Sequence, residues 1–357
     1  MSSNESPIFF WSQVLALPSE FPAWAIAVAA ALFTFIVIVI PFAALFSYFS
    51  RKLGADLQAR VGPNRSGPSG IFQPVADLLK LLQKQISGKD SQSDLWSFIQ
   101  VMGLYSTILV LPLGSGVLLV DTDMSVFLPF LGLLILAFST TLIGLNQSTI
   151  PGFFGGVRVA AISISIAFPI LLTVLTAGLQ SGGFRWSVIA NFQGASPFSW
   201  NALTNPFQFI AFLVFVISGL IFVGVSPIDA GFSGKDIEGG IGSHLSGRWL
   251  SMYRFGRFYS FFLWSIMAVV LFLGAWRLPE AITSVLRDIE AWRSLFVLEA
   301  SVLLVKTLLL MLLVLIVSTV TPRIRADQVT DLGLKVLSPF AMVALVGAAI
   351  WIGRAAL

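Results

Sequence analysis

The sequence predicts an all-α polytopic membrane protein with about eight transmembrane helices and one amphipathic helix at the membrane interface. Hydrophobic residues make up 57% of the chain and charged residues 11%, whereas soluble domains are about 25% charged. The apolar residues gather in runs of roughly 20, the length of a helix that crosses about 30 Å of hydrocarbon. Alternating ten-residue segments typical of membrane β-barrels are missing from the sequence. We therefore expect a single membrane domain over residues 1–357.

Eight apolar runs are long enough to cross the bilayer as helices. In chain order they cover residues 22–49, 97–120, 126–145, 158–180, 206–225, 257–278, 294–320 and 336–356. The residues before the first run are polar and aromatic and lack a basic segment. We expect a short interfacial helix there and no cleavable signal peptide.

The basic residues predict the orientation. Fifteen of the 21 Lys and Arg residues fall in the loops of one side and five in those of the other, and Lys306 lies within the seventh run. Because cytoplasmic loops carry the excess of Lys and Arg, both termini should lie outside, in what we expect to be a bacterial inner (plasma) membrane. The net charge of +4 reflects this orientation, and no basic face is patterned for nucleic acid.

Two connections on the basic side are long, residues 50–96 and 226–256, and such loops usually dock a partner or line an entrance. In the first, Gly-Pro pairs beginning at Gly62 and Gly67 exclude a continuous helix or strand. Apolar residues at helical spacing then predict an amphipathic interfacial helix from Val75 to Ile86. The second connection holds six glycines between residues 226 and 247, so it either folds against a partner or stays mobile.

The chain is not expected to carry out bond chemistry by itself. It has no Cys and one His, which excludes a disulfide, a thiolate metal site and a Cys-ligated iron–sulfur cluster. A phosphate-binding Walker loop, a dinucleotide fingerprint and a zinc-protease motif are all missing from the sequence. A hydrolytic triad is also not supported, because His244 has no Asp on a hydrolase pattern.

Charged residues inside apolar runs are the remaining functional signal. An ionisable group in hydrocarbon costs roughly 2.5–3.5 kcal/mol or more, so it marks function or pairing. Glu299 and Lys306 lie two helical turns apart on one face of the seventh run, and each is expected to face a polar partner. Because Lys306 is near the middle of its run, we expect it on a functional path. For Arg254 and Arg257, at the start of the sixth run, a membrane-end anchor and a functional group remain equally open alternatives.

Two motifs resemble the H-type membrane subunit of NADH:quinone oxidoreductase, respiratory complex I, whose mitochondrial counterpart is NADH dehydrogenase subunit 1. The first motif reads Arg60-x-Gly-Pro-Asn-x-x-Gly-Pro-x-Gly-x-x-Gln-Pro-x-Ala-Asp-x-x-Lys-Leu-Leu-x-Lys84. The second combines Lys306-Thr, Thr321-Pro-Arg-Ile-Arg-Ala-Asp-Gln-Val329 and Gly333-x-Lys335. Length and helix count agree, so the resemblance extends over essentially the whole chain.

The resemblance implies a subunit that forms part of a quinone chamber and docks a hydrophilic arm through its inside loops. Quinone would be bound and shared with a partner, no cofactor would be held covalently, and iron–sulfur clusters would lie only in partners. The expected partners are other membrane-arm subunits, the iron–sulfur subunits of the hydrophilic arm and the lipid bilayer. The chamber residues implied are Arg51, Arg60, Phe72, Gln73, Asp77 and Asp229. The docking residues implied are Gly62, Pro63, Asn64, Gly67, Pro68, Arg323, Arg325 and Asp327.

The sequence also departs from the family pattern at carboxylates that would pass protons into the membrane. The positions taken by carboxylates in the family carry Phe232, Gly234, Asp236, His244, Arg257 and Ala167, and Ser50 replaces a further Glu. The remaining proton-path candidates are Asp229, Asp236, Glu238, Glu299 and Lys306. Exchange of protons needs closely spaced acids with perturbed pKa values, which Phe, Gly and Ala cannot supply. We therefore interpret the chain as a divergent paralogue of the family. Its complex either couples the chamber to proton movement by another route or couples the two only weakly.

The sequence leaves two further alternatives open. One is the corresponding membrane chain of an energy-converting hydrogenase or a formate hydrogenlyase-like complex, which has no quinone. The missing carboxylates favour that branch, whereas the double Gly-Pro motif favours the quinone branch. The other is a structural anchor with a vestigial chamber. An apolar tunnel ending near Arg51 and Asp77 distinguishes the quinone-binding chain from the anchor.

Overall fold

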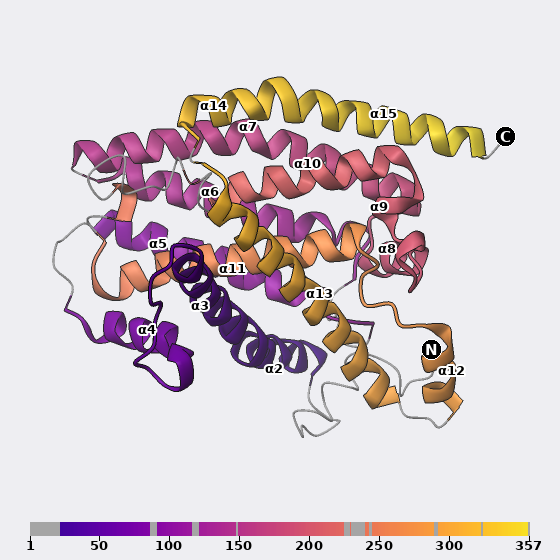
Figure 1. The fold of residues 1–357 in the computed structure, drawn as a ribbon, viewed down its shortest axis with the longest axis horizontal. Helices are drawn as coiled ribbons and strands as arrows, with labels where there is room; N and C mark the ends of the chain where they lie inside the picture. The colour runs from indigo at the N-terminus through magenta and orange to yellow at the C-terminus, as the bar shows by residue number, and fades with distance from the viewer. Residues whose placement is uncertain are drawn as a thin grey trace.

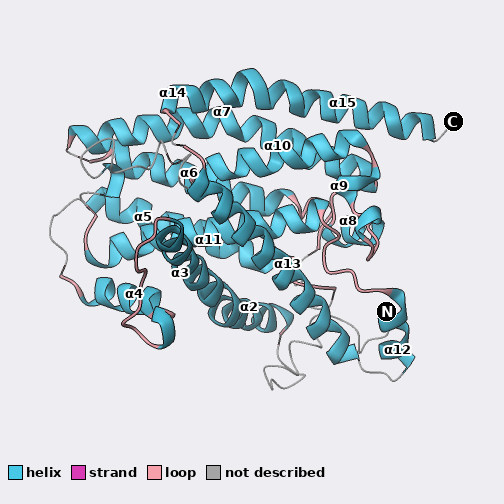
Figure 2. Cartoon of the chain, in the orientation of Figure 1, coloured by secondary structure: helices cyan, strands magenta, loops and turns pink. Residues whose placement is uncertain are grey.

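The computed structural model describes residues 22–85, 91–115, 121–147, 149–224, 229, 240–242, 245–288, 292–322 and 324–355. Throughout these ranges the chain forms helices and loops without a strand, which confirms the all-α prediction (Figures 1 and 2). Of the expected site residues, Asp236, Glu238 and Arg323 lie outside the described ranges.

Within the described ranges, seven stretches of helix are long and apolar enough to cross a membrane. The first combines α2 (Ala23–Thr34), the π-helix η2 (Phe35–Val39) and α3 (Ile40–Leu57). The next five are α6 (Phe127–Leu145), α7 (Ile150–Ser181), α10 (Pro206–Val223), α11 (Gly247–Phe272) and α13 (Trp292–Val320). The last combines α14 (Ala326–Asp331), the π-helix η7 (Leu332–Leu337) and α15 (Ser338–Ala355). These helices confirm the prediction of an integral membrane protein.

The second of the eight predicted runs, residues 97–120, forms a shorter helix than expected. It consists of α5 (Ser91–Ser106) and the 3₁₀ turn η4 (Thr107–Val110). Leu111 then adopts an extended conformation, with φ −68° and ψ 120°, because the ring of Pro112 disfavours α geometry in the residue before it. The prediction was correct about an apolar helix here and wrong about its length.

The sixth predicted run, residues 257–278, is displaced toward the N-terminus. The helix α11 begins at Gly247, ten residues earlier than predicted, because Arg248, Arg254 and Arg257 lower the hydropathy of its first turns without breaking the helix. It ends at Phe272, where Gly274 and Ala275 turn the backbone to φ 77° and 41°. These left-handed conformations stop an α-helix.

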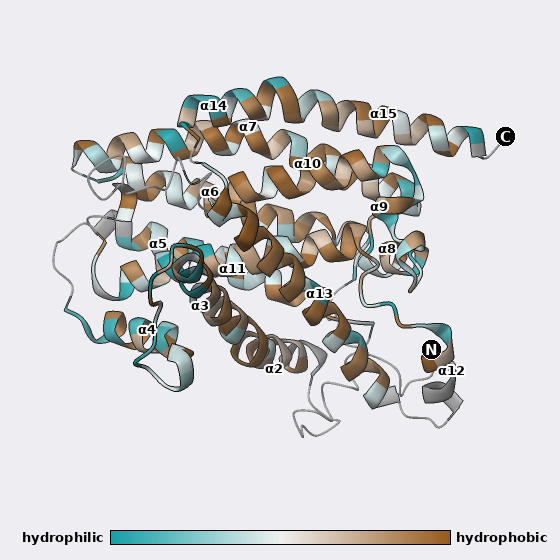
Figure 3. Cartoon of the chain, viewed as in Figure 1, coloured by the Kyte–Doolittle hydropathy of each residue, from teal (hydrophilic) through white to brown (hydrophobic). Residues whose placement is uncertain are grey.

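The helix α11 forms the centre of the molecule. In its most apolar stretch 83% of residues are buried, against 28% in the first membrane helix and in α13. It contacts α3, α5, α6, α10 and α13, and Figure 1 shows α3 and α13 crossing it obliquely while α15, α7 and α10 form a layer above. In Figure 3 apolar residues predominate along α2 and α13. Such exposed apolar surface suits contact with lipid or with other membrane helices.

The predicted amphipathic helix is present as α4 (Gln73–Gln83). It starts two residues earlier than predicted, with Pro74 in its first turn. Proline is tolerated there because the N–H groups of the first turn have no acceptor within the helix. Its C-cap is Lys84, so the predicted end at Ile86 was too late. The helix packs on α3 and α11, which brings the first long loop against the centre of the molecule.

The remaining described elements are short. They are η3 (Pro68–Gly70), α8 (Trp186–Phe192), η5 (Pro197–Ser199), α9 (Asn201–Thr204), η6 (Gly240–Gly242) and α12 (Glu280–Asp288).

Candidate functional site: a pocket between three helices

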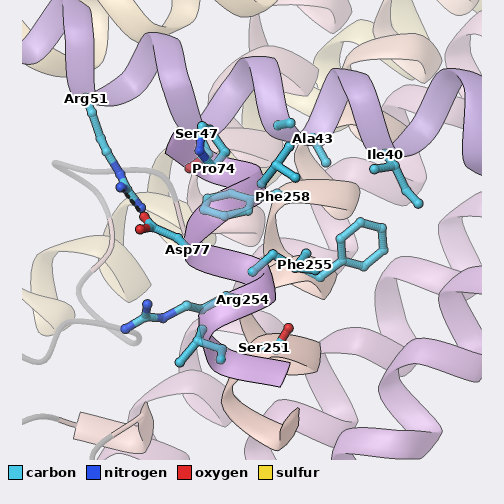
Figure 4. A pocket seen from close by; sticks show the side chains of 14 residues that line it. Ile40, Ala43, Ser47, Arg51, Pro74, Asp77, Ser251, Arg254, Phe255 and Phe258 are labelled. Atoms are coloured by element: carbon cyan, nitrogen blue, oxygen red, sulfur yellow. Dashed lines mark hydrogen bonds and ion pairs between the residues drawn. The ribbon is translucent and has the colours of Figure 1, made fainter. Parts of the chain in front are cut away.

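A pocket opens where α3, α4 and α11 meet (Figure 4). Its empty space is about 630 Å³, counted together with the solvent at its mouth. The side chains that line it are Ile40, Ala43, Ala44, Ser47 and Arg51 from α3, Pro74, Val75, Asp77, Leu78 and Leu81 from α4, and Ser251, Arg254, Phe255 and Phe258 from α11.

Helical periodicity explains why these positions share one space. On α3 the lining residues recur at intervals of three or four, from Ile40 through Ser47 to Arg51, so they form one stripe. Small side chains at Ala43, Ala44 and Ser47 leave room between the helices. The result is a largely apolar trough whose charged groups gather on one side in Figure 4.

An ion pair joins α3 to α4 at the charged side of the pocket. Nη1 of Arg51 lies 2.5 Å from Oδ2 of Asp77. The other carboxylate oxygen, Oδ1, accepts a 2.9 Å hydrogen bond from Nε2 of Gln73, and Ser66 Oγ donates to Gln73 Oε1 at 2.8 Å. The structure thus brings together three residues that the sequence assigned to a chamber: Arg51, Gln73 and Asp77.

The environment of Asp77 keeps its carboxyl group ionised. Burial acts to raise its pKa, but the hydrogen bonds from Arg51 and Gln73 and the positive charges of Arg51 and Arg254 together outweigh burial. The pKa of Asp77 is therefore lowered from its ordinary value of 3.8.

The Gly-Pro loop before α4 has a fixed shape. Gly67 and Gly70 have φ values of 76° and 80°, which only glycine adopts without strain. A Cβ atom on Gly70 would meet the carbonyl of Pro63, and one on Gly67 would meet the ring of Phe72. The hydroxyl of Tyr48 donates to the carbonyl of Ser69 at 3.1 Å, which ties the loop to α3.

Of the residues expected in the chamber, only Arg51 and Asp77 are among the described lining residues, and Gln73 contacts Asp77 from outside the lining. Arg60 is exposed at the start of the loop, and Phe72 is 59% exposed over Gly67. Asp229 is half-buried and is not among the lining residues. The described residues expected to dock a partner reach the surface: Gly62 and Pro63 are half-buried, and the exposed ones are Asn64, Gly67, Pro68, Arg325 and Asp327.

Glu299 and Lys306 face different partners. The carboxylate of Glu299 accepts from the backbone N–H and the hydroxyl of Ser115, at 2.9 and 2.5 Å. Nζ of Lys306 donates to the carbonyls of Leu273, Gly274 and Ala275 at 3.0, 3.3 and 3.0 Å. The ammonium also lies 4.8 Å from the centre of the Trp200 ring. Each charge thus has a polar partner, as the sequence predicted, and Lys306 satisfies the carbonyls that the end of α11 leaves open.

Sequence reasoning missed several lining residues, above all Arg254. Arg254 was noted at the start of an apolar run, but not as a pocket residue. Ser251, Arg254, Phe255 and Phe258 recur at helical spacing, so they were available as a stripe. The sequence pattern does not indicate that this stripe of α11 faces α3 and α4.

The arrangement suits a lipid-like molecule with a polar head. An apolar space between helices accommodates a hydrocarbon tail, and the charged side offers donors and a carboxylate to a head group. Groups of three or more His, Cys, Asp or Glu that could hold a metal are absent from the part of the chain that the structure describes.

The chain is similar in sequence to known proteins over most of its length. The sequence model of the family described as NADH dehydrogenase matches residues 29–349. The chain is 30% identical to the H-type membrane chain of NADH-quinone oxidoreductase from Rubrobacter xylanophilus, over 86% of this chain and 90% of that protein. It is 29% identical to the protein of the same name from Anaeromyxobacter dehalogenans, over 96% of this chain and 84% of that protein.

Proposed function

The chain belongs to the NADH dehydrogenase family of membrane subunits, and we propose that it is the H-type membrane chain of a complex I-like oxidoreductase, with the pocket between α3, α4 and α11 forming part of its quinone chamber. The observation that carries this proposal is the meeting of Arg51 and Asp77, 26 residues apart in the sequence, beside an apolar space. Both residues were expected at the chamber from the family resemblance alone.

Within this proposal each group of the pocket has a distinct task. The apolar side chains of α3, α4 and α11 hold the isoprenoid tail and exclude water from it. The Arg51–Asp77 pair fixes α4 against α3, so that the mouth keeps its shape. Quinone, when bound, accepts the electrons, which come from an iron–sulfur cluster in a partner protein.

The loop from Arg60 to Phe72 is proposed to dock the hydrophilic arm on the cytoplasmic side. Its glycine-dependent shape and its exposed surface support this role, because a rigid loop presents a fixed surface to a partner. Arg325 and Asp327, exposed at the start of α14, are proposed to extend the docking surface. The assembled protein would be a multisubunit complex of the membrane, with other membrane-arm subunits beside it.

Five residues remain proposed for proton transfer: Asp229, Asp236, Glu238, Glu299 and Lys306. Glu299 is held by Ser115, and Lys306 is held by the carbonyls that follow the end of α11, so direct exchange between them is not supported. The loss of the family's carboxylates at positions such as Ala167 and Arg257 favours the second candidate function, a hydrogenase-type membrane chain without quinone. The largely apolar pocket beside Arg51 and Asp77 favours the quinone-binding chain.

Purification of the tagged chain from native membranes tests the proposal. We expect the chain to purify with cluster-bearing subunits and the complex to reduce quinone in an inhibitor-sensitive reaction. A nickel–iron hydrogenase or formate dehydrogenase module in the complex, with no quinone turnover, would establish the second candidate instead.

A further inference from the structure

The charged side of the pocket carries an excess of positive charge. Among the residues that the structure describes, three ionisable side chains line the pocket: Arg51, Asp77 and Arg254. Asp77 is ionised, because its pKa is lowered, so the pocket holds two guanidinium groups and one carboxylate. One positive charge therefore remains without a matching negative charge among the described residues of the lining.

Hydrogen bonding identifies which guanidinium is free to bind a ligand. Arg51 is engaged with one oxygen of Asp77, and Gln73 occupies the other oxygen. Arg254 makes no hydrogen bond or ion pair with any residue within the described ranges. It is exposed, and in Figure 4 its guanidinium extends toward the same side of the pocket as the ion pair. The donors of Arg254 are thus available, whereas those of Arg51 are partly used.

The other two arginines of α11 differ from Arg254 in that they lie outside the pocket lining. Arg248 lies 4.9 Å above the ring of Trp249, and Arg257 donates to the carbonyl of Gly224. Neither is part of the pocket lining. Of the three arginines that open α11, Arg254 alone faces this space.

We propose that Arg254 binds the oxygen atoms of the quinone head group and makes the pocket prefer a head group that carries negative charge. The inference rests on the proposed function of the pocket as a quinone site. A guanidinium offers a planar fork of N–H donors, and its hydrogen bonds to charged oxygen are about twice as strong as those between neutral groups. A quinone whose ring hydroxyl is ionised at neutral pH therefore gains more from Arg254 than an otherwise identical neutral quinone does.

A matched pair of ligands tests this preference. One is a 2-hydroxy-1,4-naphthoquinone with an alkyl tail, whose hydroxyl is ionised at neutral pH, and the other is its neutral 2-methyl ether. Equilibrium binding of both is measured on the purified intact complex in lipid nanodiscs, with empty nanodiscs subtracted. We expect the wild-type complex to bind the ionised compound roughly tenfold more tightly than the ether. Added salt should reduce this difference, because it screens charges near the surface.

Three variants identify the residue responsible. Arg254→Gln should abolish the preference by weakening the binding of the ionised compound far more than that of the ether, and Arg254→Lys should retain part of the preference. Arg248→Gln removes the same charge from the same helix but outside the pocket, so it should behave as wild type. A preference that survives Arg254→Gln, or that Arg248→Gln lowers equally, would overturn the role of Arg254 and leave the quinone site standing. Failure of both compounds to bind the wild-type complex would overturn the quinone site as well.

Discussion

At the scale of single residues, Asp77 connects the sequence motif to the pocket. Its carboxylate is held by Arg51 from α3 and by Gln73 from its own helix. The family resemblance placed Arg51 and Asp77 along the chamber with Gln73 nearby, and the structure brings the three residues into contact. Arg254 was not predicted as their neighbour, because its approach to Asp77 depends on how α11 packs against α4. A single sequence carries no direct signal of that packing.

Replacing Asp77 with Asn should lower the stability of the complex in a pH-dependent way. Because the folded-state pKa of Asp77 is lowered below 3.8, its stabilising contribution is complete above its unfolded pKa and disappears as the pH falls through the lowered folded value. Both side chains of the pair are partly exposed, so the expected loss at neutral pH is at most about 1 kcal/mol. The measurement is the difference in Tm between wild type and Asp77→Asn across pH.

That difference should shrink toward zero below pH 3.8. Asp331→Asn is the control, because Asp331 forms a more exposed pair with Lys335 on the C-terminal helices. A difference in Tm that grows as the pH falls would contradict the assigned environment of Asp77.

At the scale of elements, the Gly-Pro loop and the end of α11 show what sequence patterns can and cannot predict. The prolines correctly excluded helix and strand from the loop, and apolar spacing correctly predicted α4. The π-helices η2 and η7 within two membrane helices were not predicted, because a hydropathy run does not distinguish one kind of helix from another. The shortened second helix could have been predicted from Pro112. The end of α11 could not be located, because apolar residues continue past Gly274.

Gly70→Ala should destabilise the docking loop. Its φ of 80° costs a non-glycine residue about 1–2 kcal/mol, and the added Cβ atom would also collide with the Pro63 carbonyl. Gly182→Ala is the matched control, since Gly182 has a φ of 78° and no atom within 4 Å of an added Cβ. Thermal unfolding of the complex should show a larger loss for Gly70→Ala, and equal losses would mean that the contact with Pro63 is unimportant.

Lys306→Met should disrupt the junction between α13 and the end of α11. Removal of the ammonium leaves the carbonyls of residues 273–275 without this donor, and each buried group left unpaired costs about 1–3 kcal/mol. The measurements are the yield and Tm of the complex and its quinone turnover, with Lys335→Met as the control at an exposed lysine.

The two roles considered for Lys306 give different results. A purely structural role predicts a lower Tm with turnover per intact complex unchanged, whereas a place on a proton path predicts that turnover falls too. Unchanged assembly and turnover would exclude both roles.

At the scale of the whole molecule, composition and basic-residue counts predicted the class of protein, and the two motifs predicted its family. The position of the pocket could not be derived in the same way, because it depends on the contacts of α11 with α3 and α4, which lie far apart in the sequence. A second reason is that charged residues in the first turns of a helix lower its hydropathy, so that the pattern does not show where the helix begins. Arg254 and Arg257 made the beginning of α11 look like a loop, although this is the part that lines the pocket.

The orientation can be tested directly because the chain has no native Cys. Single cysteines introduced at Gln58, near the first long loop, and at Ser284, in α12, are both at exposed positions. A membrane-impermeant thiol reagent should label Ser284→Cys from the outside of intact cells and Gln58→Cys only after the cells are opened. The reverse pattern would show that the basic loops face outward.

The central claim is that quinone occupies the pocket between α3, α4 and α11. The most direct measurement is photolabelling of the intact complex with a quinone that carries a photoreactive group on its tail, followed by identification of the labelled peptides. The account predicts label on residues 40–51, 74–81 and 251–258, suppressed by excess unlabelled quinone. Label confined to other helices, or label on these segments that excess quinone does not reduce, would contradict it.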